Sequence, residues 1–236
     1  MRGAILQPSY LPWLGFFEQF IFSEHFIFLD DVDYTKKDWR NRNRVRINSK
    51  QGWSWLTVPI KKQTQDLNIN EAEIDYSRNW IDKHLSTIKN IYKKTKYFDT
   101  LFPIIENHLK KKYILLVDLN INLFLDIADF IDIKRKNIRS STLKITEKDK
   151  NLRLISICKK TGIDYLYDGE KATDFIDIDL FLQNGIKVEF QKYNHPEYTQ
   201  RFKPFIPYLS AIDLLFNYGK DSLDYIIQNT KIKAFV

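Results

Sequence analysis

The chain has 236 residues, of which 44% are hydrophobic and 15% aromatic, and it carries a formal charge of +7 with a pI of about 9.2. This composition argues against a disordered chain, and the length predicts one α/β domain over residues 1–236, with a helical sub-region near 78–135. The single cysteine excludes an internal disulfide framework and a cysteine zinc cluster, and the lack of a long apolar run or a leader pattern predicts a cytoplasmic protein without a membrane span.

The beginning of the chain has the pattern of a strand, a helix and a second strand. Short apolar runs at 2–6 and 25–29 predict the strands, and apolar residues at helical spacing over 14–21 predict the helix. Two strands joined by a helix lie parallel, with a right-handed crossover. We therefore expect an α/β fold with a parallel sheet.

Ligands of such a sheet bind at the carboxyl ends of its strands, which here begin at Gln7 and Asp30. Gln7 can hydrogen-bond a ligand from the first end, and Tyr10 can stack on one. Asp31 and Asp33 can share a face at the second end, where they would orient an ammonium group, accept its proton, or bind magnesium with a diphosphate. Turn formation and capping are the ordinary uses of aspartate in such a place.

Residues 39–46 read WRNRNRVR, with arginine at every second position. Side chains alternate between the two faces of a strand, which predicts one row of guanidinium groups from Arg40, Arg42, Arg44 and Arg46. Arginine binds phosphate and carboxylate through paired hydrogen bonds, so a phosphorylated substrate or an acidic partner is the first expectation. We expect Arg40, Arg42 and Arg44 to hold a diphosphate. The alternative is a solvated strand whose cations keep it soluble.

A polar turn at 48–52 and the run WSWLTVPI at 53–60 complete a hairpin with this arginine strand. Trp39 is expected to stack a nucleobase or a sugar ring, because aromatic rings mixed with arginine form such platforms. The other tryptophans near these elements are assigned to packing; they are Trp13, Trp53 and Trp55.

Apolar stripes predict further helices, one near 80–92, one starting at 114, and one from 152 that ends near Gly162. Cys158 lies on the buried face of the last of these helices. We expect it to be a small core residue rather than a nucleophile.

The last third of the chain contains a predicted strand at 186–193 that runs into a proline-rich loop. His195 in this loop is the best candidate for a general base, because histidine exchanges a proton near neutral pH. Its neighbours Tyr198 and Gln200 are expected to contact the substrate. The alternative is a histidine that fixes the loop through the backbone. The other three histidines are expected to be structural, and no two of the four have metal-ligand spacing.

Six segments resemble the WbqC-like family, in the same order and over nearly the whole chain: LQPSYLPWLGFFEQF, FLDDVDYTKKDWRNRNRVR, GWSWLTVPI, KHLSTI, FQKYNHPEYTQ and LSAIDLLFNYG. The resemblance implies a bacterial protein of a surface-polysaccharide or O-antigen cluster that transfers glycine or another acyl group to an amino sugar. YLYDGEKA at 165–172 departs from the small Ser/Gly-rich turn of the family. If that turn contacts the substrate, we expect the substrate of this chain to differ from that of other family members.

The segment QPSYLPWLGFF also resembles the HxGH turn of nucleotidyltransferase-like Rossmann domains, with Gly15 in the glycine position. This second resemblance implies a Rossmann-like parallel sheet core with an inserted hairpin and helical segments. Trp13 and Phe16 stand where the two triphosphate-binding histidines would be, and their rings cannot neutralise phosphate charge. Ordinary nucleotidyl transfer is therefore disfavoured.

With the resemblance to the WbqC-like family, these features predict an N-acyl or aminoacyl transferase, for example of a glycyl group. Its expected acceptor is a nucleotide-linked amino sugar, and the resemblance implies a role in O-antigen or lipopolysaccharide biosynthesis. No cofactor or metal is firmly implied. The activated donor is expected to be a thioester on an acidic acyl carrier protein, which suits the basic chain, and aminoacyl-tRNA stays open as a donor. The alternatives are an ATP-using ligase or nucleotidyltransferase-like enzyme, and a non-catalytic module that binds RNA or glycan.

Overall fold

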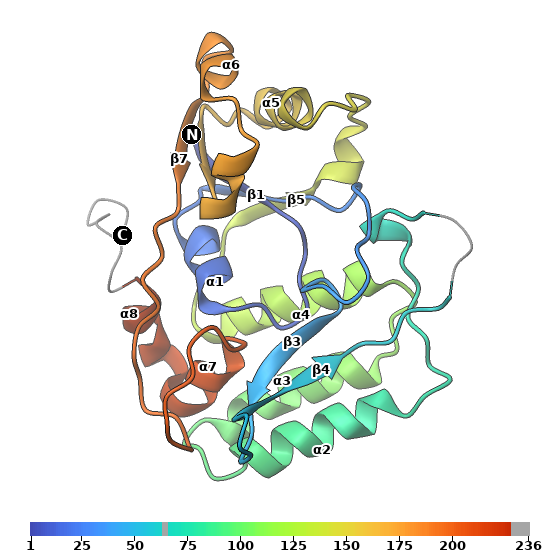
Figure 1. Ribbon diagram of the computed structural model, residues 1–236, viewed down its shortest axis with the longest axis vertical. Helices are drawn as coiled ribbons and strands as arrows, with labels where there is room; N and C mark the ends of the chain where they lie inside the picture. The colour runs from blue at the N-terminus through green and yellow to red at the C-terminus, as the bar shows by residue number, and fades with distance from the viewer. Residues whose placement is uncertain (63–65, 228–236) are drawn as a thin grey trace.

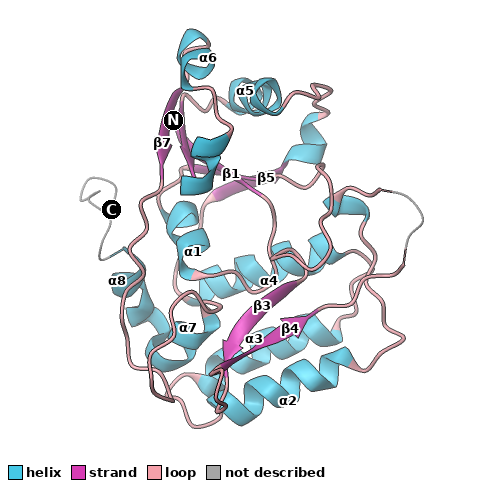
Figure 2. Ribbon diagram, in the orientation of Figure 1, coloured by secondary structure: helices cyan, strands magenta, loops and turns pink. Residues whose placement is uncertain are grey.

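Five parallel strands form the central sheet of the computed structural model, which describes residues 1–62 and 66–227 (Figures 1 and 2). The strands are β1 (Arg2–Leu6), β2 (His25–Phe28), β5 (Lys136–Arg139), β6 (Tyr165–Asp168) and β7 (Lys187–Phe190). They lie in the order β5-β2-β1-β6-β7, and each neighbouring pair is parallel. This is the order of a doubly wound, Rossmann-like sheet. The prediction of an α/β fold with a parallel core is confirmed.

Helices cover both faces of this sheet. The α-helices of the described residues are α1 (Leu14–Ile21), α2 (Trp80–Tyr92), α3 (Phe98–Lys110), α4 (Leu116–Phe130), α5 (Lys150–Thr161), α6 (Ile178–Gln183), α7 (Ile212–Tyr218) and α8 (Ser222–Ile227). Side chains alternate along each strand, so Phe26 and Phe28 of β2 pack with α1 and α4, whereas Ile27 packs with α5 and α6. The sheet is therefore buried between two apolar layers.

Phe124 of α4 lies at the centre of the layer that α1 and α4 form on the sheet. Its ring centroid lies between 4.9 and 6.3 Å from the rings of Phe16, Phe17, Phe20, Phe26 and Phe28. Most of these rings meet edge-on or tilted, which is the arrangement that aromatic quadrupoles favour. These six rings are about a third of the 17 phenylalanines of the chain.

The helical residues expected near 78–135 form α2, α3 and α4, between β2 and β5 in the chain. Two of the histidines that were expected to be structural lie here. His84 Nδ1 is 2.9 Å from the Tyr10 hydroxyl, and His108 Nε2 is 2.7 Å from a carboxylate oxygen of Asp126. Both imidazoles are thus engaged within the protein.

The predicted hairpin consists of β3 (Arg42–Arg46) and β4 (Trp53–Thr57), which pair antiparallel. Gly52 closes its turn with a φ of 77°, a conformation that favours glycine. One side of the hairpin is buried in the same core as α1 and α4, through Val45 and Leu56. In Figure 1 the hairpin lies at the opposite end of the molecule from α5 and α6.

Short 3₁₀-helices complete the structure: η1 (Ile69–Glu71), η2 (Ser140–Leu143), η3 (Glu170–Asp174) and η4 (Gly219–Asp221). No helix in the described part of the chain is long and apolar enough to cross a membrane. Within residues 1–62 and 66–227, no group of three or more His, Cys, Asp or Glu side chains is placed to hold a metal ion.

Candidate functional site

The arginines of β3 and the tryptophans of β4 share one face of the hairpin. Arg44 lies opposite Trp55, and Arg46 lies opposite Trp53. Residues directly opposite in an antiparallel pair point to the same side, so this face carries cations and indoles, while Val45 between the arginines points into the core. The predicted alternation is confirmed within the strand.

A hollow of about 380 Å³ opens on this face, and we call it the arginine–tryptophan pocket. It is lined by Lys37, Asp38, Trp39, Arg42, Arg44, Trp53 and Trp55. The Arg42 guanidinium carbon lies 4.1 Å from the ring centroid of Trp55, and that of Arg44 lies 5.2 Å from Trp53 and 5.7 Å from Trp39. Such distances give cation–π attraction and hold the planar groups against flat walls. Three of the predicted site residues thus come together.

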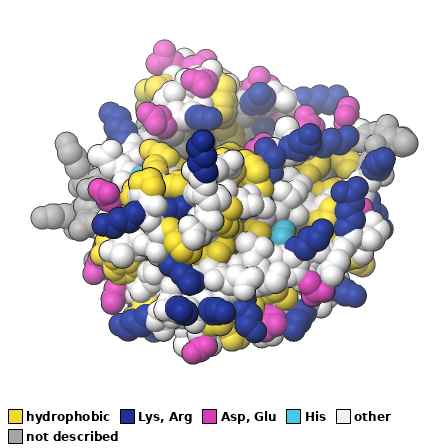
Figure 3. Space-filling model, turned by 60° about the horizontal axis from the view of Figure 1, so that its bottom comes forward, with side chains coloured by type: hydrophobic (Ala, Val, Ile, Leu, Met, Phe, Trp, Pro, Cys, Tyr) yellow, Lys and Arg dark blue, Asp and Glu magenta, His cyan; other side chains and the backbone are white. Residues whose placement is uncertain are grey.

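Lys37, Arg42 and Arg44 outnumber the one acid among the lining residues, Asp38, so the charge of the pocket favours an anion. Arg44 is partly withdrawn from water, and this burial lowers the pKa of its guanidinium group. Trp39 stays 43% exposed at the rim. On the face of the molecule shown in Figure 3, Lys and Arg side chains are spread widely rather than gathered in one patch. The pocket is therefore set apart from the general basic surface by its indole walls.

Arg40 precedes the strand and takes a different position from Arg42 and Arg44. Its guanidinium donates hydrogen bonds to the Asp38 carboxylate and to Gln7 Oε1. Gln7 follows β1, so this contact ties the carboxyl end of β1 to the start of the hairpin. Arg40 and Gln7, both predicted to bind a ligand, therefore hydrogen-bond to each other.

The prediction of four arginines in one row, all accessible to a ligand, is wrong for Arg46. It is only 1% exposed, and its Nη2 donates to the carbonyls of Phe202 and Pro204 at 2.9 Å each. Its Nη1 donates to the Gly52 carbonyl. Arg46 therefore fastens the loop after β7 to the hairpin and is closed to a ligand.

The prediction that Tyr10 stacks on a ligand is also wrong, because its side chain is fully buried and its hydroxyl pairs with His84. Trp53 and Trp55, which were assigned to packing, line the pocket instead. A signal for them was present in the sequence. They alternate along the second strand of a hairpin, and pairing with an arginine strand places such residues on the arginine face.

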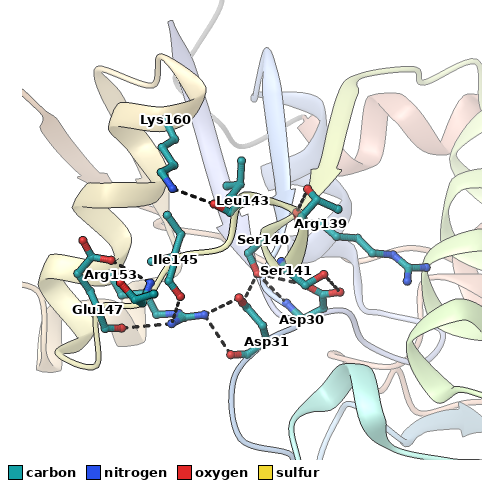
Figure 4. A network of polar contacts seen from close by, with 12 residues as sticks. Asp30, Asp31, Arg139, Ser140, Ser141, Leu143, Ile145, Glu147, Arg153 and Lys160 are labelled. Carbon is teal, nitrogen blue, oxygen red and sulfur yellow. Dashed lines mark hydrogen bonds and ion pairs between the residues drawn. The ribbon is translucent and has the colours of Figure 1, made fainter.

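The predicted pair of carboxylates, Asp31 and Asp33, does not form. Asp31 Oδ2 lies 2.5 Å from Arg153 Nη2 of α5, and Asp31 Oδ1 accepts from the Ser140 hydroxyl (Figure 4). Asp33 is exposed and forms a backbone bridge with Asn68. Asp31 is neutralised by a cation from another element, so it is not free to receive an ammonium group.

Asp30, the residue before Asp31, joins the ends of the neighbouring strands β2 and β5. Its carboxylate accepts hydrogen bonds of 2.9 Å from both the backbone N–H and the hydroxyl of Ser141, and its own N–H donates to Ser140 Oγ (Figure 4). The SST segment at 140–142 therefore acts as a structural turn after β5.

His195 lies in a ring of aromatic side chains. Its centroid is 5.0 Å from that of Tyr208 and 5.9 Å from that of Phe205, and its Nδ1 lies 2.9 Å from the Pro196 carbonyl. Its Nε2 is buried and has no hydrogen-bond partner among the described residues. Burial lowers the pKa of His195, although the bond to Pro196 raises it. Arg44 Nη2 donates to the Tyr208 carbonyl at 2.9 Å, so this loop borders the pocket.

Tyr198 and Gln200 hold the loop and are not among the residues that line the pocket. The Tyr198 hydroxyl donates to Asp213 Oδ2 at 3.1 Å, and Tyr92 donates to Oδ1 of the same buried carboxylate at 2.8 Å. The Gln200 amide bonds both the N–H and the carbonyl of Ile206 at 2.8 Å. Their prediction as substrate contacts is corrected by these internal bonds.

One carboxylate at the carboxyl end of the sheet was not singled out from the sequence. Asp168 ends β6, is 8% exposed, and accepts a hydrogen bond of 2.6 Å from the N–H of Gly169. Burial raises its pKa to about 6, although the bond from Gly169 lowers it. The unusual YLYDGEKA segment could have drawn attention to Asp168 in the sequence. That its strand, β6, lies beside β1 is known only from the sheet order.

Comparison with known proteins gives a family and no reaction. A model of the family described as "WbqC-like protein family" matches residues 7–225. An uncharacterized protein of Mycobacterium tuberculosis (strain ATCC 25618 / H37Rv), Rv1507c, is 32% identical over 231 residues, which are 95% of this chain and 97% of that protein. No solved structure matches the chain.

Proposed function

The chain belongs to the WbqC-like protein family, and we propose that it is an N-acyl or aminoacyl transferase acting on a nucleotide-linked amino sugar during the assembly of bacterial surface polysaccharide. The observation that carries the proposal is the arginine–tryptophan pocket, where Arg42 and Arg44 lie against three indoles. The pocket is joined to the carboxyl edge of a Rossmann-like sheet through Arg40 and Gln7. Ligands of open α/β sheets bind at that edge.

The two parts of a sugar nucleotide match the two kinds of group in the pocket. The guanidinium groups of Arg42 and Arg44 would neutralise the diphosphate through charge-assisted hydrogen bonds. An indole, with Trp39 as the exposed one, would stack on the nucleobase or on a sugar ring. The volume of about 380 Å³ fits part of such a ligand, with the remainder extending towards Gln7.

The reaction needs an activated donor, since an amide does not form from a free carboxylate without a leaving group. In the proposed step the sugar nitrogen attacks the carbonyl carbon of a thioester, forming a C–N bond. The C–S bond breaks and the thiolate leaves, while a proton from nitrogen passes to a base and then to the thiolate. An acidic carrier protein suits the net charge of +7.

The test mixes the full chain with carrier proteins loaded with glycine or short acyl groups and with a panel of nucleotide-linked amino sugars. We expect mass spectrometry to detect the amide, and the double variant R42A/R44A to make much less of it. Arg78→Ala is the matched control, because Arg78 lines a separate hollow at the start of α2. Absence of an amide across the whole panel would overturn the proposal.

A second candidate, a non-catalytic RNA-binding module, is favoured by the exposed indole of Trp39 beside stacked guanidinium groups. Single-stranded nucleic acid binds to such surfaces by stacking and charge. The ATP-using ligase is less favoured, because the Trp13 ring covers Gly15 at the start of α1. A Cβ atom on Gly15 would lie 2.3 Å from that ring, so the indole fills the place where triphosphate would approach.

A further inference from the structure

The order of the strands marks one place on the sheet where a crevice is expected. β1 and β6 are neighbours, and the helices that follow them, α1 and α6, lie on opposite faces. The two strands pair at Arg2 with Tyr165 and at Gly3 with Leu166. Neighbouring strands whose connections leave in opposite directions open a crevice at their carboxyl ends, which is where such sheets bind ligands.

Asp168 lies at this place. It lies two residues beyond Leu166, the last residue of β6 that pairs with β1, and it still pairs with Phe190 of β7. Asp168 is therefore level with Ile5, about 7 Å along the strand direction from the level of Gln7. Gln7 in turn accepts a hydrogen bond from Arg40 at the start of the hairpin. Asp168 and Gln7 thus lie at the same edge of the sheet, and the hairpin contacts this edge through Arg40.

Asp168 lies on an apolar face of β6. It shares a strand face with Leu166, which is fully buried in the layer of α5 and α6. Burial and the nearby Asp168 carboxylate raise the pKa of the Cys158 thiol to about 12. Cys158 is itself completely buried, as expected for a core residue. A carboxylate beside such groups is poorly solvated and accepts a proton readily.

Asp168 also differs from the other acids at this edge of the sheet. The Asp30 carboxylate accepts hydrogen bonds from Ser141, and Asp31 is paired with Arg153. Within residues 1–62 and 66–227 no cationic side chain forms an ion pair with Asp168, and the N–H of Gly169 is the donor to its Oδ1. His195 is enclosed by aromatic rings in the loop that follows β7.

We infer that Asp168 is the catalytic base that receives the proton of the attacking sugar amine. The inference rests on the proposed transferase function. The carboxylate would first attract the ammonium form of the sugar, which becomes a free amine by losing one proton to solvent. It would then take the second proton as nitrogen attacks the thioester carbonyl and the C–S bond breaks. The proton would leave with the thiolate, which returns Asp168 to its charged form.

The first test compares turnover of wild-type protein, Asp168→Asn and Asp168→Glu with carrier-bound donor and the nucleotide sugar that reacts. General base catalysis typically contributes about 10² to 10⁴ in rate, so we expect kcat of Asp168→Asn to fall at least about 100-fold. KM should change by less than about threefold, because Arg42 and Arg44 supply most of the affinity, and Asp168→Glu should restore part of kcat. The matched control is Glu170→Gln, which changes an exposed acid two residues away.

The second test does not depend on turnover. Protein labelled with ¹³C-aspartate is titrated with UDP-glucosamine and UDP-glucose, alongside the other members of the panel. We expect the Asp168 carboxyl signal to shift with amino sugars that bind the pocket and to respond much less to their hydroxyl counterparts. Unchanged kcat in Asp168→Asn, or no shift with any bound amino sugar, would overturn the inference even if wild-type protein forms the amide. A shift without any amide product would overturn the transferase proposal instead.

Discussion

Arg44 shows how one side chain can serve both the structure and a ligand. Its Nη2 donates to the Tyr208 carbonyl, while its planar group lies near the rings of Trp53 and Trp39. A guanidinium has five donors, so one hydrogen bond to the protein leaves others for phosphate. Lysine offers a single ammonium group that cannot stack in this way. The pocket therefore depends on arginine chemistry rather than on charge alone.

We predict that Arg44→Lys weakens binding of UDP by about tenfold although the charge is kept. Hydrogen bonds to charged groups contribute about 1.5–3 kcal/mol, and 1.4 kcal/mol corresponds to a factor of ten in Kd. Isothermal titration calorimetry measures the change in Kd. Arg78→Lys is the control, because it makes the same substitution outside the pocket. Equal affinity of wild-type protein and Arg44→Lys would show that the pocket does not bind the diphosphate.

His84 gives the molecule a dependence of stability on pH. Burial lowers its pKa to about 4, although a hydrogen bond to the Thr57 backbone raises it, whereas an unfolded chain has a histidine pKa near 6.5. The folded state therefore keeps His84 neutral where the unfolded state binds a proton. Its contribution is present above pH 6.5 and is lost as pH falls towards 4.

We expect wild-type protein to lose about 2 kcal/mol more unfolding free energy than His84→Gln when pH is lowered from about 7 to 5. The variant lacks the titrating imidazole, so this part of the pH dependence should disappear. Urea unfolding at both pH values measures the difference. The same loss in both proteins would mean that His84 is not held neutral in the core.

Asp168 should act in the opposite sense. Its pKa is raised by burial to about 6, above the value near 3.8 in an unfolded chain, so the folded state binds the proton more tightly. Ionisation therefore costs stability as pH rises through 6, by about 3 kcal/mol when complete. We predict that Asp168→Asn is more stable than wild-type protein at pH 8 by about 2 kcal/mol, and that urea unfolding at pH 4 gives equal values. A less stable variant at pH 8 would contradict an apolar site for this carboxylate.

A small network of side chains joins the ends of β2 and β5, just beyond their last paired residues, Phe28 and Arg139. Asp30 follows β2, and Ser140 and Ser141 follow β5; Figure 4 shows their side chains converging. The Asp30 N–H donates to the buried Ser140 oxygen at 3.1 Å. This network positions the turn of η2 at the edge where β2 and β5 end.

Ser140→Ala should lower the free energy of unfolding by about 1–3 kcal/mol. The change leaves the buried N–H of Asp30 without its acceptor, and an unsatisfied buried donor carries about that cost. Chemical denaturation measures the loss. UDP affinity should stay within about twofold, because the arginine–tryptophan pocket shares no residue with this network. A large loss of affinity in a folded variant would place η2 at the ligand site.

The fold of the whole molecule shows which parts of the site could be predicted from sequence. Strand alternation is local, so the arginine face of the hairpin followed from the spacing of residues 42–46 alone. Partners from distant segments could not be found in this way. The bond of Tyr10 with His84 joins residues far apart in the chain, and so does the ion pair of Asp31 with Arg153. Because of these internal partners, the side chains of Tyr10 and Asp31 are not available to a ligand.

The sheet order is a second property that local patterns do not contain. The first strand–helix–strand unit was predictable, but only the full order β5-β2-β1-β6-β7 places Asp168 beside the end of β1. The loop after β7 was read as a substrate loop, whereas Arg46 and Asp213 hold most of it against the hairpin and α7. Charged and hydroxyl groups that appear catalytic in a sequence can therefore be structural once distant elements meet.

The net charge of +7 allows the sugar-nucleotide and RNA hypotheses to be separated by salt. RNA that follows a basic surface contacts many cations and releases many counterions, so its affinity falls by about 10³ or more between about 50 and 200 mM salt. A diphosphate held by two arginines against indole walls makes few such contacts. We predict that UDP loses less than about tenfold in affinity over the same range, and that a single-stranded RNA oligomer binds weakly and loses its binding. Fluorescence titration of the pocket tryptophans follows both ligands. Tight RNA binding with a steep salt dependence, abolished in R42A/R44A, would favour the binding module over the transferase.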